Sequence, residues 1–195
     1  MKRSLCVLAM TAALLVAAPL AHATIITYHT ALSGVNESPP NASLGVGSAI
    51  VTIDDALNTM RVEATFSGLT GTVTAAHIHC CTSAPFTGTA GVATPVPTFP
   101  GFPSGVTGGT YDATFDLTMA TSWNPAFVTA HGGTTATAEA ALLAGLSTGE
   151  AYLNIHTTTF GGGEIRGFLA VPEPVSLALV GLALTGLGFS RRQTQ

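Results

Sequence analysis

The chain has 195 residues and a formal net charge of −4, because ten Asp and Glu residues outnumber six Lys and Arg residues. Its length suits one domain rather than several, and an acidic chain with so few cations is a poor partner for phosphate backbones, so nucleic-acid binding is not expected. Hydrophobic residues make up 47% of the chain and charged residues only 8%. Much of the apolar excess lies in two end segments, which leaves a polar, Thr-rich and Gly-rich middle.

The first 23 residues have the three parts of a secretory signal peptide. A cationic start is followed by an apolar run over 5–20, and Ala21 and Ala23 then place small residues at the two positions that signal peptidase reads. A retained membrane anchor is the weaker alternative, because the run is short for a membrane span. We therefore expect cleavage after Ala23 and an exported mature protein.

The middle segment, 24–171, alternates apolar and polar residues in short runs, which is the pattern of half-buried β-strands. Turn residues such as Asp54, Asp55 and Asn58 separate the runs. About seven short strands with mostly local connections predict an all-β domain, an antiparallel sandwich or a barrel. The strands are expected at 25–32, 49–53, 60–66, 73–79, 111–117, 150–157 and 164–169.

Two other segments interrupt the strands. One short helix is expected at 135–146, because Ala138, Leu142 and Leu146 fall on one side of it and Gly149 follows its end. The stretch 85–109 holds five prolines and many glycines, which predicts one long ordered or half-ordered loop.

Near the C-terminus an apolar run without charges covers 175–189. Fifteen helical residues extend about 22 Å, which is short against a hydrocarbon core of about 30 Å, so we expect a temporary membrane tether. The positive-inside rule places the following Arg191 and Arg192 in the cytoplasm and the preceding domain outside it. The prolines of the preceding motif, Pro172, Glu173 and Pro174, keep it extended and accessible to a protease.

This C-terminal segment, 171–195, resembles the PEP-CTERM sorting signal, in which Pro-Glu-Pro precedes a short apolar helix and terminal arginines. The resemblance implies cleavage by an exosortase in a Gram-negative bacterium that makes exopolysaccharide. It also implies that the domain is released or transferred to the cell surface from an intermediate tethered to the inner membrane.

Four phrases of the middle segment resemble the chordin-type (CHRD) domain, and together they span nearly all of 24–170. The resemblance implies an extracellular all-β domain, repeated in animal chordins that regulate secreted growth factors and present singly in bacterial exported proteins, where no molecular activity is established. The chain departs from the family pattern at Cys80 and Cys81 and in the length of its proline-rich loop. The four phrases are Leu-Ser-Gly-Val-Asn-Glu-Ser-Pro-Pro at 32–40, Gly45 before a strand, Ala-His-Ile-His at 76–79, and Tyr-Leu-Asn-Ile-His-Thr at 152–157 with Gly-Glu-Ile-Arg-Gly at 163–167.

The strand pattern predicts one polar patch rich in histidine. His77 and His79 are two residues apart, so on a strand their side chains share one face about 6.6 Å apart. The same alternation places polar residues of the last two strands on one face, above a core of Ile78, Ile155 and Ile165. If these strands are neighbours, the patch gathers His77, His79, Asn154, His156, Glu164 and Arg166.

Two interpretations of this patch are open. Three imidazoles with an open fourth position can hold zinc or copper, which would use His77, His79 and His156. The favoured alternative is a structural cluster, in which neutral histidines donate to Asn154 or Glu164 and Arg166 pairs with Glu164.

Cys80 and Cys81 are adjacent in an oxidising compartment once Cys6 is lost with the signal peptide. A vicinal disulfide, ligation of a soft metal, pairing between molecules and two reduced thiols are all open. A disulfide here would close too small a loop to stabilise the fold through chain entropy.

The sequence lacks the common catalytic motifs, with no Gly-x-Ser-x-Gly, no phosphate-binding glycine loop and no His-Glu-x-x-His, so catalysis is unsupported. The leading hypothesis is a non-enzymatic surface or matrix protein. Its partners would be signal peptidase, exosortase and an extracellular component, with membrane contact only through the transient C-terminal helix. The rival is a copper or zinc protein that stores metal or performs dismutase-like chemistry. A third hypothesis, a polysaccharide-binding module, needs exposed aromatic residues, yet Trp123, Tyr111 and Phe127 are expected in the core.

Overall fold

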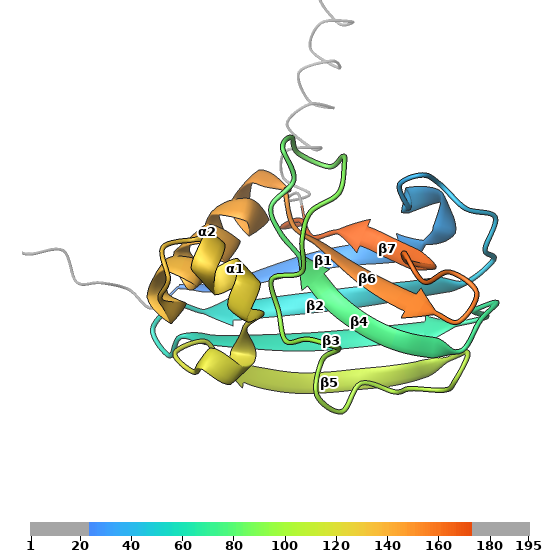
Figure 1. Cartoon of the computed structure of the whole chain (residues 1–195), viewed down its shortest axis with the longest axis horizontal. Helices are drawn as coiled ribbons and strands as arrows, with labels where there is room; N and C mark the ends of the chain where they lie inside the picture. The colour runs from blue at the N-terminus through green and yellow to red at the C-terminus, as the bar shows by residue number, and fades with distance from the viewer. Residues whose placement is uncertain (1–23, 173–195) are drawn as a thin grey trace, which may run out of the picture.

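A computed structural model describes residues 24–172 (Figure 1). The expected signal peptide and its cleavage site at Ala23 lie outside the described residues. The same holds for Glu173, Pro174, the apolar run 175–189 and the two terminal arginines. Within 24–172, no helix combines the length and the apolar character needed to cross a membrane.

Seven antiparallel strands form one sheet that curls into a half barrel (Figure 1), which confirms the all-β prediction. The strand order is β4-β6-β7-β1-β2-β3-β5, so β4 and β5 are the edge strands. The strands are β1 (Ile25–Ser33), β2 (Val46–Asp54), β3 (Thr59–Ser67), β4 (Val73–His79), β5 (Gly109–Asp116), β6 (Tyr152–Thr157) and β7 (Ile165–Phe168).

The β2–β3 hairpin shows how the alternation builds the core. Val51 pairs with Val62 and Ile53 with Met60, so the apolar residues of both strands share one face, and all four are buried. The Asp54 carboxylate accepts hydrogen bonds from two amides of the connecting turn. At the other end of the sheet, the expected core residues Ile78, Ile155 and Ile165 are fully buried.

The expected helix is α2 (Thr135–Thr148), which begins with a capping box between Thr134 and Thr137 and ends at Gly149 in the left-handed conformation. A six-residue helix, α1 (Pro125–Ala130), precedes it and begins where the Asn124 side chain accepts a hydrogen bond from the Ala126 amide. Both helices lie at one end of the curled sheet (Figure 1). Two short 3-10 helices complete the fold, η1 (Gly34–Asn36) and η2 (Ala120–Ser122).

The long loop between β4 and β5 is ordered by the free edge of β4. Its residues Ala93 and Phe99 donate backbone hydrogen bonds to Ile78 and Ala76, and the Thr94 hydroxyl accepts one from the Ile78 amide. Phe99 itself is fully buried in the core. The loop therefore covers an edge that would otherwise expose unpaired backbone groups.

Candidate functional site

One face of β4, β6 and β7 carries a row of polar side chains, which we call the polar face. Pairing of β4 with β6 sets His77 opposite Asn154, and pairing of β6 with β7 sets Asn154 opposite Arg166. His77, Asn154 and Arg166 are all buried, because neighbouring loops lie over them. The three strands are neighbours, as the expected polar patch required.

The three histidines of the polar face form a compact cluster. The ring centroids of His77 and His156 lie 5.2 Å apart, those of His79 and His156 5.7 Å, and those of His77 and His79 5.8 Å. One ring nitrogen from each residue lies within 4.8 Å of the other two. This is the group of three potential metal ligands that residues 24–172 bring together.

Each imidazole is oriented by a backbone carbonyl. His77 Nε2 lies 2.6 Å from the Pro97 oxygen, His79 Nδ1 2.9 Å from the Ala90 oxygen, and His156 Nδ1 3.0 Å from the Gly161 oxygen. A carbonyl oxygen only accepts, so a neutral ring keeps its hydrogen on the nitrogen that faces the carbonyl. The second nitrogen of each ring is then left with a free lone pair.

Those second nitrogens are all enclosed by the protein. His77 Nδ1, His79 Nε2 and His156 Nε2 are buried, and none has a hydrogen-bond partner among the described residues. Metal-ligating histidines are commonly held by such a hydrogen bond from the other ring nitrogen. The cluster therefore combines three free acceptors with three fixed ring orientations.

Burial keeps these rings neutral. Desolvation lowers the pKa of His77 and His156, and it lowers that of His79 to about 4 despite the hydrogen bond to Ala90. Repulsion from the neighbouring imidazoles and from Arg166 acts in the same direction at His79. A neutral imidazole is the form that binds metal ions.

The spacing of the cluster is somewhat wide for a single bound ion. Bonds of about 2.0–2.1 Å to zinc place two nitrogen ligands no more than about 4.2 Å apart. A pair of ring nitrogens at the 4.8 Å limit would therefore have to close by about half an ångström. Small rotations of three side chains suffice for that change.

Glu164 does not join the polar face, and the expected pairing of Glu164 with Arg166 is wrong. Its carboxylate accepts hydrogen bonds from Ser43 Oγ (2.6 Å), Thr157 Oγ1 (2.6 Å) and the amides of Thr70 (2.5 Å) and Gly71 (3.1 Å). Burial acts to raise the pKa of Glu164, but these four bonds lower it below the ordinary value. Strand alternation does not predict the direction of the Glu164 side chain, because β7 begins only at Ile165.

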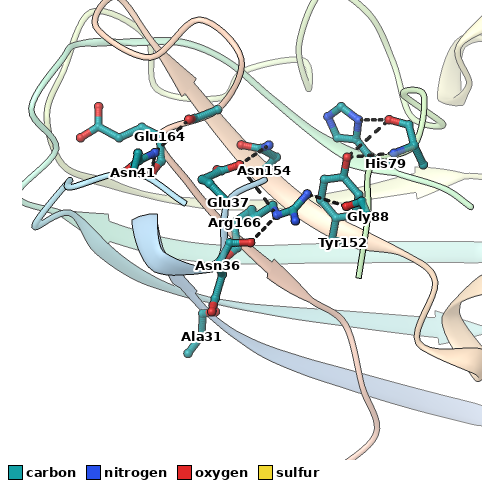
Figure 2. A network of polar contacts seen from close by, with 12 residues as sticks. Ala31, Asn36, Glu37, Asn41, His79, Gly88, Tyr152, Asn154, Glu164 and Arg166 are labelled. Carbon is teal, nitrogen blue, oxygen red and sulfur yellow. Dashed lines mark hydrogen bonds and ion pairs between the residues drawn. The ribbon is translucent and has the colours of Figure 1, made fainter. Parts of the chain in front are cut away.

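Arg166 instead faces a carboxylate that sequence reasoning missed. Its Nε donates to the Asn36 oxygen (2.5 Å) and its Nη1 to the Gly88 oxygen (2.9 Å), while Nε lies 3.8 Å from Glu37 Oε2 (Figure 2). Glu37 lies in the Asn-Glu-Ser-Pro-Pro phrase that carried part of the family resemblance. This phrase could have drawn attention to Glu37, but nothing in the strand pattern connects it with Arg166.

Cys80 and Cys81 form a disulfide, one of the four alternatives that the sequence left open. Both sulfur atoms pack against Gly145 of α2, where an added Cβ would have no room. In this state neither cysteine offers a thiolate beside His79, so a metal at the cluster would have only the three histidines as ligands.

Comparison with known proteins identifies a single family. Residues 28–169 match the family described as CHRD domain. No curated protein and no solved structure gives a significant match.

Proposed function

The chain belongs to the CHRD domain family, and from that premise we propose that it is an exported, non-enzymatic binding module that holds one copper or zinc ion between His77, His79 and His156. One observation carries the proposal. Within one cluster of three histidines, each ring has a buried nitrogen without a hydrogen-bond partner in the described structure, and a backbone carbonyl orients each ring. A copper or zinc ion would accept all three lone pairs.

The energetic cost of the unpaired ring nitrogens supports a ligand between the three histidines. A buried acceptor without a partner costs about 1–3 kcal/mol, and the cluster contains three of them. A purely structural cluster would be expected to satisfy these atoms, since most buried polar groups in proteins are hydrogen-bonded. The expected structural partners Asn154 and Glu164 make no hydrogen bond to the rings, which favours the metal interpretation over the one that sequence alone favoured.

The enclosed position supports binding rather than turnover. All three ligand nitrogens are buried, and the ring of His79 stacks on that of Tyr152 at 4.8 Å. The loop that supplies the Ala90 and Pro97 carbonyls lies against the same rings. A catalytic metal needs an accessible open position, so storage or a structural role suits the cluster better than dismutase-like chemistry.

The export route rests on the two end segments. In this proposal signal peptidase cleaves after Ala23, and an exosortase acts at Pro172, Glu173 and Pro174 while Arg191 and Arg192 stay in the cytoplasm. The domain then reaches the cell surface or the extracellular matrix and meets its partner there. Exposure of Val171 and Pro172, at the end of the described domain, supports access by a membrane protease.

Elemental analysis tests the metal site. The domain 24–172 is produced in an oxidising compartment, offered copper and zinc, dialysed, and compared with a His77→Ala/His79→Ala variant and with His29→Ala as the matched control. His29 is exposed on β1, away from the cluster. We expect about one metal equivalent in wild type and in the control, and none in the double variant. Wild-type protein that stays folded and metal-free would refute the metal site and leave a binding module with another ligand.

A further inference from the structure

A cavity of about 470 Å³ lies beside Arg166, outside the histidine cluster. We call it the Arg166 cavity. Four segments form its walls: Thr30 of β1, residues 35–38 around η1, residues 86–88 of the long loop, and Arg166 with Phe168 of β7. Its volume lies within the range of small-molecule sites, about 300–1,000 Å³.

Phe86 lines this cavity and has an unfavourable backbone conformation. Its φ is 57°, in the left-handed region that bulky residues rarely adopt, and its side chain is 59% exposed. A backbone hydrogen bond to the Gly149 oxygen (2.8 Å) and contact of the ring with Gly149 hold it there. Backbone strain combined with an exposed aromatic ring indicates selection for function rather than for stability.

Phe86 is also the one aromatic residue among the large exposed hydrophobic residues of the described chain. Trp123, Tyr111 and Phe127 are buried, as expected from the sequence. Phe86 meets Phe168 edge to face, with ring centroids 6.0 Å apart. An exposed aromatic residue thus borders a polar cavity.

The polar groups of the cavity offer both donors and acceptors. Arg166 uses Nε and Nη1 for the Asn36 and Gly88 oxygens, and Nη2 has no hydrogen-bond partner among residues 24–172 (Figure 2). The exposed hydroxyls of Ser38 and Thr87 line the same space. The Arg166 guanidinium faces the Glu37 carboxyl at 3.8 Å, and burial raises the pKa of Glu37 to about 7, so the cavity carries a paired charge above that pH.

These groups select one chemical class of ligand. Above pH 7 an anion would meet the negative charge of Glu37, whose pKa is about 7. A cation would meet Arg166, and a purely apolar ligand would bury the guanidinium donors without partners. A neutral sugar ring presents a C–H face that can stack on an aromatic ring, and its hydroxyls both donate and accept hydrogen bonds. We propose that the Arg166 cavity binds a neutral sugar unit of an extracellular polysaccharide, with Phe86 as the stacking surface and Arg166 and Thr87 as hydrogen-bonding groups.

Affinity electrophoresis tests this second site in the metal-free protein, so that its outcome is separate from that of the histidine cluster. The domain 24–172 is stripped with a chelator and run in native gels that contain a soluble β-glucan, an α-glucan or a galactomannan, with alginate as the acidic comparison. The Phe86→Asn variant removes the ring and suits the left-handed backbone, because Asn tolerates positive φ. Leu57→Ala, at an exposed apolar residue in the β2–β3 turn, is the matched control.

We expect wild type and Leu57→Ala to be retarded by at least one neutral polysaccharide. We expect Phe86→Asn to lose about tenfold in affinity, the size of one aromatic contact. Phe86→Leu, which keeps apolar bulk without the aromatic face, should behave like Phe86→Asn and serves if that variant folds poorly. No retardation of wild type in the neutral gels, retardation by alginate alone, or wild-type affinity in folded Phe86 variants would each overturn the proposal.

Discussion

At the scale of single residues, two buried oxygen atoms near Arg166 lack hydrogen bonds. Glu37 Oε1 and Asn154 Oδ1 are both buried without a partner, and both face the α-carbon of Gly163. Asn154 Nδ2 donates to the other carboxyl oxygen of Glu37 at 3.5 Å. A proton on Glu37 Oε1 would let the acid donate to the amide oxygen, and both orphan atoms would then be satisfied.

The pKa of Glu37 agrees with this assignment. Burial raises it to about 7, although Arg166, Asn154 and the Ser38 amide act to lower it. A pKa raised from 4.5 means that the folded state holds a proton more tightly than the unfolded chain does. The resulting stabilisation is complete below about pH 4.5 and is lost as the pH rises through 7.

Replacing Glu37 with Gln should remove this pH dependence. The Gln side chain can donate permanently to Asn154 Oδ1, so we expect Glu37→Gln to gain about 2 kcal/mol relative to wild type between pH 5.5 and pH 8. Urea unfolding of metal-free protein at both pH values measures the difference. The three histidines, whose pKa values are lowered, act in the opposite direction in both proteins, so the comparison between the proteins isolates Glu37. An equal stability difference at the two pH values would contradict a protonated Glu37.

At the scale of elements, helix α2 is fitted to the disulfide at the end of β4. Gly145 is buried in the last turn of α2, and glycine within a helix ordinarily costs about 1 kcal/mol relative to alanine. Here a methyl group at Gly145 would overlap both sulfur atoms of Cys80 and Cys81. The close approach of helix and strand end therefore explains the glycine.

Gly145→Ala should consequently destabilise the domain in spite of its better helix propensity. We expect a loss of about 1–3 kcal/mol from overpacking, measured by thermal or urea unfolding. In a Cys80→Ala/Cys81→Ala background the same change should cost much less, because the sulfur atoms are gone. Equal costs in the two backgrounds would show that the contact with the disulfide is not the cause.

The elements also show what the sequence could and could not predict. The alternation of apolar and polar residues in 60–66 and 73–79 identified β3 and β4. One face of each strand packs on the core, so every second residue is apolar. The alternation also placed His77 and Asn154 in one polar patch, on the condition that their strands are neighbours, whereas their direct pairing is seen only in the structure. The ring orientations were not predictable, because the carbonyls of Ala90, Pro97 and Gly161 belong to loops, and a backbone carbonyl has no side-chain signature.

At the scale of the whole molecule, the histidine cluster and the Arg166 cavity lie on the same polar face. Tyr152 separates them, since its ring stacks on His79 at 4.8 Å and lies 4.7 Å from the Arg166 guanidinium carbon. The long loop touches both sites, through the Gly88 oxygen at Arg166 and the Ala90 oxygen at His79 (Figure 2). One ordered loop therefore supports both proposed ligands of the domain.

In the proposed export route, the segments that flank the domain direct it to the cell exterior. Val171 and Pro172 are exposed where the described residues end, so the proposed processing motif begins at the surface of the domain. Processing at the motif would separate the folded domain from the apolar run 175–189 without cutting any strand of the sheet. The domain released in this way would keep both proposed sites intact.

Substitution of the motif should therefore trap the protein at the membrane. In a Gram-negative host with an exosortase, we expect the full chain with Pro172→Ala, Glu173→Gln and Pro174→Ala to stay in the membrane fraction at the mass left by signal peptidase. Wild type and a Gln195→Ala control should instead appear as a shorter species at the surface or in the medium, as detected by immunoblotting of cell fractions. If the triple variant and wild type show the same mass and the same fraction, the motif is not the processing signal, and the apolar run would then have to act as a lasting anchor.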